Sequence, residues 1–380
     1  MDIALTNMFT ASDAAMMSRA IQIAERGRAI ATPNPFVGCV IVKHGRIIGE
    51  GFTRAGGRPH AEADALASCT ESPESATVYS TLEPCATHAT SRGPACSDLL
   101  IAAKIKRVVS ALHDPFEGVD GKGHANLQAA GIALEIGLME AEVKSQLKAF
   151  LKRVTAGRPY VRLKIAASID GKTALSNGQS QWITSAESRR DVHVMRRDAC
   201  AIFTGIGSVL ADNPALTVRD VPCERQPLRV VLDSQFVIAD DMAILEGGNT
   251  MIVTATDNPA RVAALAARGV DVTLVVREAS GGKNDGKINL NAMMAQLAAK
   301  NLNNLMVEAG AKLNASLIAA NVVDEIIFYL APSILGDNAK GLFALPAMQH
   351  LREKIDLKFT DVRNVGADIK ITASITANNT

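Results

Sequence analysis

The chain has 380 residues, of which 48% are hydrophobic, 21% charged and 4% aromatic, and its formal net charge is +1. This length favours about two to three domains, and the near-neutral charge with few aromatics gives no support for a nucleic-acid-binding groove, so we expect a small-molecule substrate. No segment approaches about 18 consecutive apolar residues, and six cysteines are too sparse for a disulfide framework. We therefore expect a cytoplasmic protein with no membrane span and no nucleic-acid partner.

The first half of the chain alternates between helical and strand-like patterns, which is typical of layered α/β domains. A helix is expected up to Arg26, with Ser12 and Asp13 able to cap its start and Gly27 ending it. The other elements expected in this half are a hairpin of 37–42 and 46–52, helices over 60–69 and 97–103 and from Asn126 and Glu140, and strands over 77–81, 107–112 and 132–136.

One group of residues in this half indicates metal chemistry. His60, Cys85 and Cys96 supply an imidazole and two thiolates, and Glu62 adds a spare carboxylate. Structural zinc normally has four protein ligands, so three leave one corner of the tetrahedron open for water. Zinc lowers the pKa of that water from ~15.7 to about 7, and Glu62 can then take the water proton and deliver it to a leaving amine. The pattern predicts hydrolytic deamination.

Two other interpretations stay open at this level. A closed structural zinc site could recruit His88 from the loop between the cysteines, and free cysteines can also be small buried apolar residues without any metal. Ten residues separate Cys85 from Cys96, far more than in the P-C-x-x-C signature of zinc deaminases. The loop must therefore turn back if both sulfurs are to reach one ion.

A domain boundary is expected near 155–159, where a helix-breaking cluster precedes a new strand-like run. This divides the chain into a first domain, 1–154, and a second domain, 159–380. The elements expected in the second domain are strands over 160–167, 201–204, 228–233, 250–255 and 305–310, helices over 185–198 and 311–320 and near Pro259 and Leu290, and a long surface loop over 278–286.

Two turns of the second domain could hold phosphates. Gly310 lies between an expected strand and helix, and residues 205–208 form a similar glycine-rich turn after a strand. Backbone amides at a helix start suit a nucleotide's phosphates, although such turns are more often simply tight turns. The G-x-G-x-x-G fingerprint is absent, so a standard Rossmann site is not supported.

Longer stretches carry a resemblance to a known family. These stretches are 34–42, 55–62 and 81–85 in the first half, and 164–172, 181–185, 210–219 and 307–310 in the second. In them the chain resembles the bifunctional riboflavin-biosynthesis proteins, in which a pyrimidine deaminase is fused to a pyrimidine reductase. The resemblance implies an α/β protein with an N-terminal cytidine-deaminase-like α/β/α domain and a C-terminal dihydrofolate-reductase-like α/β domain. The latter would account for the missing Rossmann fingerprint.

The implied activity has two steps. A diaminopyrimidinone that carries a ribosylamino 5′-phosphate first loses its 2-amino group by hydrolysis, and the ribosyl group is then reduced to ribityl with NADPH. The product is the uracil precursor of riboflavin. The resemblance thus implies Zn²⁺ and NADPH as cofactors, a small phosphorylated pyrimidine as substrate, and a homo-oligomer.

The resemblance also assigns residues. It makes His60, Cys85 and Cys96 the zinc ligands and Glu62 the proton shuttle, and it places Asn34 against the pyrimidine. The positions that it places against the substrate of the reductase are Lys164, Ser180, Arg196, Leu216, Arg219 and Glu308. The positions that it places along NADPH are Ala166, Trp182, Ser208, Asp212, Ser234 and Gly310.

Arg196 and Arg219 have the fork geometry that suits a ribose 5′-phosphate.

Some details do not transfer from the family. The loop 86–95 is longer than in the family, so His88 and Arg92 stay open between solvent exposure and contact with substrate phosphate. No residue stands out for the 2′-phosphate of NADPH.

Two rival functions remain at this stage. One is a free-nucleoside or tRNA deaminase fused to an unrelated reductase, which the absence of a basic surface argues against. The other is a non-catalytic protein with a structural zinc and a nucleotide-sensing second domain.

Overall fold

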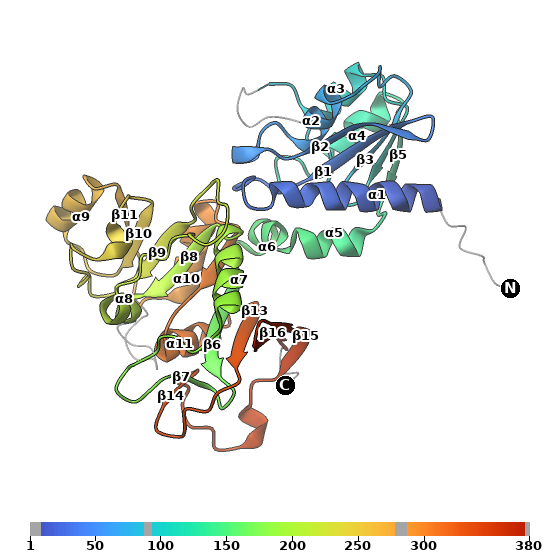
Figure 1. Ribbon diagram of the computed structural model, residues 1–380. Helices are drawn as coiled ribbons and strands as arrows, with labels where there is room; N and C mark the ends of the chain where they lie inside the picture. The colour runs from blue at the N-terminus through green and yellow to red at the C-terminus, as the bar shows by residue number, and fades with distance from the viewer. Residues whose placement is uncertain (1–8, 87–92, 278–286, 377–380) are drawn as a thin grey trace. The chain divides into compact units, whose positions relative to one another are not determined.

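The computed structural model describes residues 9–86, 93–277 and 287–376. His88, Arg92 and the loop expected over 278–286 lie outside the described residues. The chain divides into two compact units, Met1–Gly157 and Arg158–Thr380 (Figure 1). This divide falls inside the helix-breaking segment 155–159. Within the described residues no helix is long and apolar enough to cross a membrane.

The first unit is built on a five-stranded sheet in the order β2-β1-β3-β4-β5. β1 runs antiparallel to both β2 and β3, whereas β3, β4 and β5 are parallel. The strands are β1 (Gly38–Lys43), β2 (Arg46–Phe52), β3 (Thr77–Ser80), β4 (Arg107–Ser110) and β5 (Ala133–Ile136).

Helices cover both faces of this sheet (Figure 1). They are α1 (Ala11–Ala24), α2 (Ala61–Ala67), α3 (Cys96–Ala102), α4 (Lys122–Ala129), α5 (Glu140–Gln146) and α6 (Lys148–Ala156). Two glycines allow the close approach of α1 and α2. A Cβ on Gly38 would lie 1.9 Å from the Ala20 carbonyl of α1, and one on Gly51 would lie 2.3 Å from the Ala61 carbonyl of α2. Gly51 pairs with Cys39, the neighbour of Gly38, so the two helices lie on opposite faces.

The start of α1 differs from the prediction. Thr10 caps the helix, because its Oγ1 accepts from the Asp13 N–H at 3.1 Å while the Asp13 carboxylate accepts from the Thr10 N–H at 2.8 Å. Ser12 lies within the first turn, so the expected cap at Ser12 or Asp13 was wrong by two to three residues. The regular helix ends at Ala24, and a short 3₁₀ turn, Glu25–Gly27, follows it.

The second unit is built on a nine-stranded sheet in the order β11-β10-β9-β8-β12-β6-β13-β16-β15. All neighbours from β11 to β13 are parallel, and β16 and β15 add an antiparallel hairpin at one edge. The strands are β6 (Tyr160–Ser168), β8 (Ala201–Gly205), β9 (Leu228–Leu232), β10 (Thr250–Thr254), β11 (Val270–Leu274), β12 (Asn304–Val307), β13 (Glu325–Ala331), β15 (Leu357–Val365) and β16 (Asp368–Ile375). A separate small sheet pairs β7 (Lys172–Ala174) with β14 (Lys340–Gly341).

The helices of this unit are α7 (Ala186–Arg197), α8 (Ile206–Asp212), α9 (Pro259–Ala266), α10 (Leu290–Ala299) and α11 (Ala311–Ala319). Helix α7, which Ser185 caps, packs through Val192 on Ile327 and Tyr329 of β13. Because β6, β8, β9 and β12 are parallel, their carboxyl ends share one edge of the sheet, which is where open α/β sheets bind ligands.

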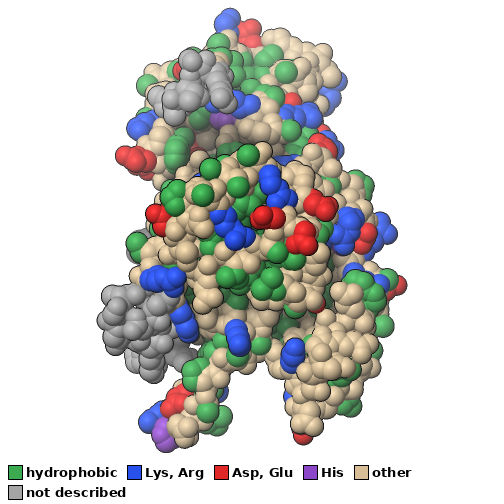
Figure 2. All heavy atoms as spheres, turned by 90° about the vertical axis from the view of Figure 1, so that its left-hand side faces the viewer, with side chains coloured by type: hydrophobic (Ala, Val, Ile, Leu, Met, Phe, Trp, Pro, Cys, Tyr) green, Lys and Arg blue, Asp and Glu red, His purple; other side chains and the backbone are tan. Residues whose placement is uncertain are grey.

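Several elements of the second unit were not expected from the sequence. The turn at 205–208 is the start of α8, and the sequence predicted no element beyond residue 320, where the structure has β13, β14, β15 and β16. On the face drawn in Figure 2, Lys and Arg side chains are interspersed with Asp and Glu.

Candidate functional site

The three predicted zinc ligands meet in the first unit. His60 Nδ1 lies 3.5 Å from Cys85 Sγ and 3.4 Å from Cys96 Sγ, and the three donor atoms all lie within 4.8 Å of one another. Zn–S bonds of about 2.3 Å and Zn–N bonds of about 2.0–2.1 Å at tetrahedral angles place a nitrogen and a sulfur donor about 3.6 Å apart. The spacing of these donors therefore fits one tetrahedral zinc ion.

Local structure sets the position of each donor. His60 is the N-cap residue of α2, and Cys96 is the first residue of α3, so two helix starts face each other. Cys85 follows β3, and its Sγ accepts from the Cys96 N–H at 3.3 Å. The two ends of the ten-residue loop therefore lie close together, and residues 87–92 between them lie outside the described residues.

The electrostatics of the cluster favour a thiolate. Hydrogen bonds from Cys96 and His60 lower the pKa of Cys85 to about 4 against the effect of burial. The pKa of Cys96 is raised, because it shares its proton with the Cys85 sulfur and is buried. Cys85 thus forms a thiolate readily beside the imidazole. A cation between the two sulfurs would also favour the thiolate form of Cys96, since zinc binds thiolates.

Glu62 lies in the first turn of α2, two residues after His60. Its side chain is buried, and only 3% of the residue's surface is exposed. The Ser80 hydroxyl, from the end of β3, donates to Glu62 Oε1 at 2.9 Å. Burial raises the pKa of Glu62, although His60 and Ser80 act in the opposite direction. A carboxyl in this position holds a proton more readily than an exposed one, which suits a group that must take up a proton and release it again.

Asn34 borders the segment that leads to His60. Its side-chain amide donates to the Gly57 carbonyl at 3.2 Å, and a Cβ on Gly57 would lie 2.5 Å from the Asn34 amide carbon. Gly57 also has a φ of 87°, which favours glycine. The close packing fixes the Asn34 side chain.

Glu83 is a residue whose role the sequence analysis missed. Its buried carboxylate accepts from the backbone N–H groups of Asp114, Gly121, Gly123 and His124 at 3.0–3.2 Å. These residues belong to the loop after β4 and the start of α4, so Glu83 ties that loop to the chain that carries Cys85. The sequence signal for this role is a glutamate two residues before a predicted metal-binding cysteine.

Glu83 also lies near His113 and His124, and these three side chains have donor atoms within 4.8 Å of one another. The arrangement does not suit a metal, because the carboxylate oxygens already accept four backbone hydrogen bonds. The His113 ring also contacts Asp120 Oδ1 at 3.0 Å. This group therefore serves to hold the loop.

In the second unit, three of the predicted substrate residues form a charged cluster. Arg196 from α7 makes a bidentate pair with Glu308, with Nε–Oε1 at 2.5 Å and Nη2–Oε2 at 3.0 Å, and Lys164 Nζ from β6 lies 3.5 Å from Glu308 Oε2. Burial alone would raise the pKa of Glu308, but Arg196 and Lys164 lower it to about 2. The carboxylate is therefore charged and the cluster carries a net positive charge.

Arg219 and Leu216 lie beside this cluster. Arg196 Nη1 donates to the Thr217 carbonyl at 3.2 Å, and Arg219 Nη1 donates to the Thr217 hydroxyl at 3.2 Å. Leu216 is buried and Arg219 is exposed. Since Arg196 is already paired with Glu308, Arg219 is the better placed of the two arginines to bind a phosphate from solvent.

Four of the six predicted NADPH residues lie near the carboxyl ends of neighbouring strands. Ala166 lies in β6, Gly310 follows β12, Ser208 lies in the first turn of α8 after β8, and Ser234 follows β9. Asp212 ends α8 and is exposed. These four strands are consecutive in the sheet, so the four positions form a row across the carboxyl ends of the strands.

Ser180 and Trp182 lie on the segment between β7 and α7, apart from this row in the chain. The Trp182 side chain is 70% exposed, with the Arg189 guanidinium 4.6 Å from its ring centre. The ring therefore lies at the surface of the unit with the Arg189 guanidinium against it.

The start of α11 is open at Gly310. Gly310 caps α11 without any side-chain hydrogen bond to the helix start, and a Cβ added to it would meet only Ser208 Oγ, at 3.9 Å. The amides of this helix start are thus accessible to phosphate oxygens, and the helix dipole favours an anion there. These residues fit a nucleotide cofactor.

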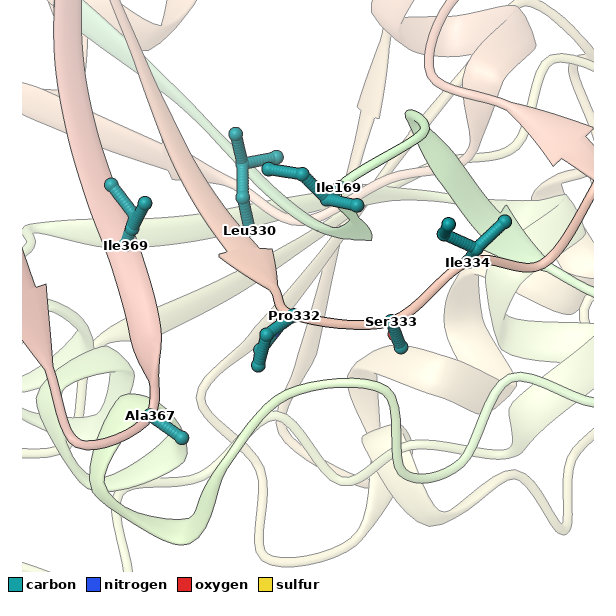
Figure 3. A pocket seen from close by; sticks show the side chains of 7 residues that line it. All are labelled: Ile169, Leu330, Pro332, Ser333, Ile334, Ala367 and Ile369. Carbon is teal, nitrogen blue, oxygen red and sulfur yellow. The ribbon is translucent and has the colours of Figure 1, made fainter.

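A separate pocket of about 530 Å³ lies near the carboxyl end of β13. Figure 3 shows that its lining side chains are almost entirely apolar, with Ser333 among them. Its lining residues are Ile169, Leu330, Pro332, Ser333, Ile334, Ala367 and Ile369. The pocket contains none of the predicted substrate or cofactor residues.

Known proteins match both parts of the chain. The model of the cytidine and deoxycytidylate deaminase zinc-binding region matches residues 10–112, and that of the RibD C-terminal domain matches residues 159–371. The riboflavin biosynthesis protein RibD of Escherichia coli (strain K12) is 42% identical over 365 residues, which cover 93% of this chain and 96% of the relative. That of Aquifex aeolicus is 36% identical, over 93% of this chain and 96% of its own length.

Solved structures also match over nearly the whole length. Acinetobacter baumannii RibD superposes with a TM-score of 0.86 at 35% identity, over 96% of this chain and 99% of the other. A Thermotoga maritima protein described as a diaminohydroxyphosphoribosylaminopyrimidine deaminase and 5-amino-6-(5-phosphoribosylamino)uracil reductase superposes with a TM-score of 0.83 at 31% identity, with the same coverage.

Proposed function

The chain belongs to the RibD family of riboflavin-biosynthesis proteins, and from this membership we propose how its residues divide the work. The protein is a bifunctional enzyme with a deaminase step and a reductase step, and its cofactors are Zn²⁺ and NADPH. The expected fold class is confirmed, with a cytidine-deaminase-like unit before a RibD reductase unit. Residues 1–154 carry the deamination and residues 159–380 the reduction.

The substrate is a small phosphorylated pyrimidine, the diaminopyrimidinone with a ribosylamino 5′-phosphate that the name of the Thermotoga relative describes. The first unit replaces its 2-amino group by oxygen, and the second reduces the ribosyl side chain to ribityl. Family membership decides against the two rival functions that the sequence left open.

His60, Cys85 and Cys96 hold the zinc, and the observation that supports this most strongly is the 3.4–3.5 Å spacing of their donor atoms. Zinc held there would supply a water molecule with its pKa lowered to about 7. Glu62 takes the proton from that water and passes it to the departing amine, while Ser80 keeps the carboxylate oriented. Asn34 contacts the pyrimidine ring.

A pair of cysteine variants tests this site. Cys96→Ser should lose bound zinc and deamination, whereas Cys69→Ser, a half-buried cysteine of the same unit, should keep one zinc per chain and full activity. Zinc is measured by atomic emission on the purified variants, and deamination by the mass of the product. Full zinc content in Cys96→Ser would remove Cys96 from the ligand set.

In the reductase unit, the substrate is held by Lys164, Ser180, Arg196, Leu216, Arg219 and Glu308. Arg219 binds the 5′-phosphate, because it is exposed and its guanidinium suits a phosphate, while Arg196 fixes the Glu308 carboxylate that faces the sugar. NADPH lies along Ala166, Trp182, Ser208, Asp212, Ser234 and Gly310. The nicotinamide then lies at the β6 end of the row, next to the charged cluster that binds the ribosyl group.

The protein acts in the cytoplasm as a homo-oligomer. None of its six cysteines, all of which lie in the described part of the chain, forms a disulfide, which suits a reducing compartment. Strand β15 is an edge strand of the reductase sheet and exposes Phe359 (60%) and Val362 (56%). The exposed residues of β15 also include Lys358 and Arg363, and we assign the apolar patch of Phe359 and Val362 on this strand to a contact with a second copy of the chain.

Light scattering on Val362→Lys tests the oligomer. The variant should have a lower molar mass than the wild type, because the contact would have to bury the charged lysine in place of an apolar side chain. An unchanged mass would exclude β15 as the interface.

A further inference from the structure

The outer part of the reductase sheet brings together three polar side chains. Ser234, Thr256 and Arg277 follow β9, β10 and β11, which are neighbours in the sheet and parallel. The Thr256 hydroxyl donates to the Ser234 carbonyl at 3.0 Å, and Arg277 Nη2 donates to the same carbonyl at 3.2 Å. The Ser234 carbonyl thus links the carboxyl ends of three strands, which lie side by side in Figure 1.

The row of proposed cofactor residues leads to this point. It runs through β6, β12, β8 and β9, and neighbouring strands are about 4.8 Å apart, so the row spans about 14 Å. Hydride transfer requires the nicotinamide to lie against the ribosyl group, which the cluster at β6 binds. An extended dinucleotide that starts at β6 therefore brings its adenosine half to β9 and beyond.

NADPH differs from NADH only at this adenosine end, where a phosphate replaces the 2′-hydroxyl of the ribose. Arg277 is exposed, and Ser234 and Thr256, which share the Ser234 carbonyl with it, are half-buried. A guanidinium donates to phosphate oxygens in a fork, and an arginine close to the adenosine ribose is a common means of accommodating a 2′-phosphate.

We propose that Arg277, supported by Ser234 and Thr256, binds the 2′-phosphate of NADPH and makes the reductase select NADPH over NADH. This inference rests on the proposed function of the second unit, and it supplies the residue that the sequence did not identify. Ser234 contributes its hydroxyl to the phosphate, and its carbonyl holds the guanidinium in place.

Binding of cofactor to the full-length chain, measured by titration calorimetry, tests the proposal. Arg277→Ala should weaken NADPH binding by roughly 10- to 100-fold, the range expected for lost hydrogen bonds to a charged group, and leave NADH binding unchanged. Arg277→Lys should fall between, because it keeps the charge and loses the fork. Arg268→Ala is the matched control, since Arg268 is an exposed arginine of the same unit that also donates to a carbonyl, that of Asp240 at 2.8 Å.

A fragment pair isolates the phosphate itself. Adenosine 2′,5′-bisphosphate should lose affinity in Arg277→Ala, whereas adenosine 5′-monophosphate should not. Equal weakening of NADPH and NADH, or unchanged NADPH affinity in Arg277→Ala, would overturn the role of Arg277 while leaving the reductase intact. Failure of the wild type to bind NADPH would instead overturn the proposed function of the unit, and this inference with it.

Discussion

Replacing Glu308 by glutamine removes the carboxylate that pairs with two cations inside the reductase unit. The side chains of Glu308, Arg196 and Lys164 are only 12%, 11% and 16% exposed, so solvent screens this cluster weakly. Burial opposes the charge on Glu308, yet the two cations lower its pKa from the ordinary 4.5 to about 2. A pKa difference of one is worth about 1.4 kcal/mol, so the charged carboxylate stabilises the fold by about 3 kcal/mol.

The same magnitude follows from the cost of leaving a buried charge unpaired, about 3–5 kcal/mol. For a unit of this size, 1 kcal/mol lowers Tm by about 2–4 °C, so Glu308→Gln should lower the Tm of the reductase unit by about 6–12 °C at pH 7. Differential scanning calorimetry of the full chain measures this change. Asp271→Asn is the control, because Asp271 pairs with Lys300 at 49% and 41% exposure, and its loss should cost less than about 1 kcal/mol.

The pH dependence gives a second check. Because the pKa of Glu308 is lowered in the folded state, its contribution is complete above about pH 4.5 and is lost as the pH falls toward 2. The difference in stability between wild type and Glu308→Gln should therefore shrink to less than half by about pH 3. If Glu308→Gln melted within about 2 °C of wild type at pH 7, or if the difference grew at low pH, the cluster would not be a stabilising ion pair.

Three further predictions concern the two sites. Glu62→Gln should keep zinc but lower the rate of deamination by at least about 10²-fold, as measured by zinc content and product mass, and an unchanged turnover would remove Glu62 from proton transfer. Arg219→Ala should raise the KM of the reductase for the phosphorylated substrate and leave an unphosphorylated analogue unaffected, so an equal loss with both would refute its role as the phosphate clamp. Glu83→Gln should speed the release of zinc to a chelator, because the glutamine amide cannot accept hydrogen bonds from all four backbone N–H groups and the loop beside Cys85 loosens. Glu74→Gln, which removes an exposed salt bridge, is the control. Equal rates of zinc release in the two variants would limit Glu83 to a role unrelated to zinc.

The sequence was most informative where chemistry restricts the residue types. An imidazole, two thiols and a spare carboxylate suit few purposes besides zinc catalysis. The structure brings His60, Cys85 and Cys96 together, although ten residues separate the two cysteines. Helix starts were placed less well. Thr10 caps α1 through a reciprocal bond with Asp13, and a pattern of apolar residues does not distinguish this threonine from Ser12.

The reductase unit was harder to predict because its site is assembled from distant strands. Glu308 and Arg196 are 112 residues apart in the chain, and their pairing depends on α7 packing across β12 and β13. The sequence indicates that each residue is charged but not that the charges meet. The same holds for Arg277, which reaches Ser234 only because β9, β10 and β11 adjoin in the sheet.

The mass of the product formed from the diaminopyrimidinone ribosylamino phosphate, with and without NADPH, tests the central claim most directly. The zinc-loaded wild type should replace one amino group by oxygen without NADPH, and should do the same and add two hydrogens when NADPH is present. Glu62→Gln should leave the substrate unchanged in the first condition. Replacement of the amino group with no reduction in either condition, or deamination that survives in Glu62→Gln, would contradict the division of work between the two units.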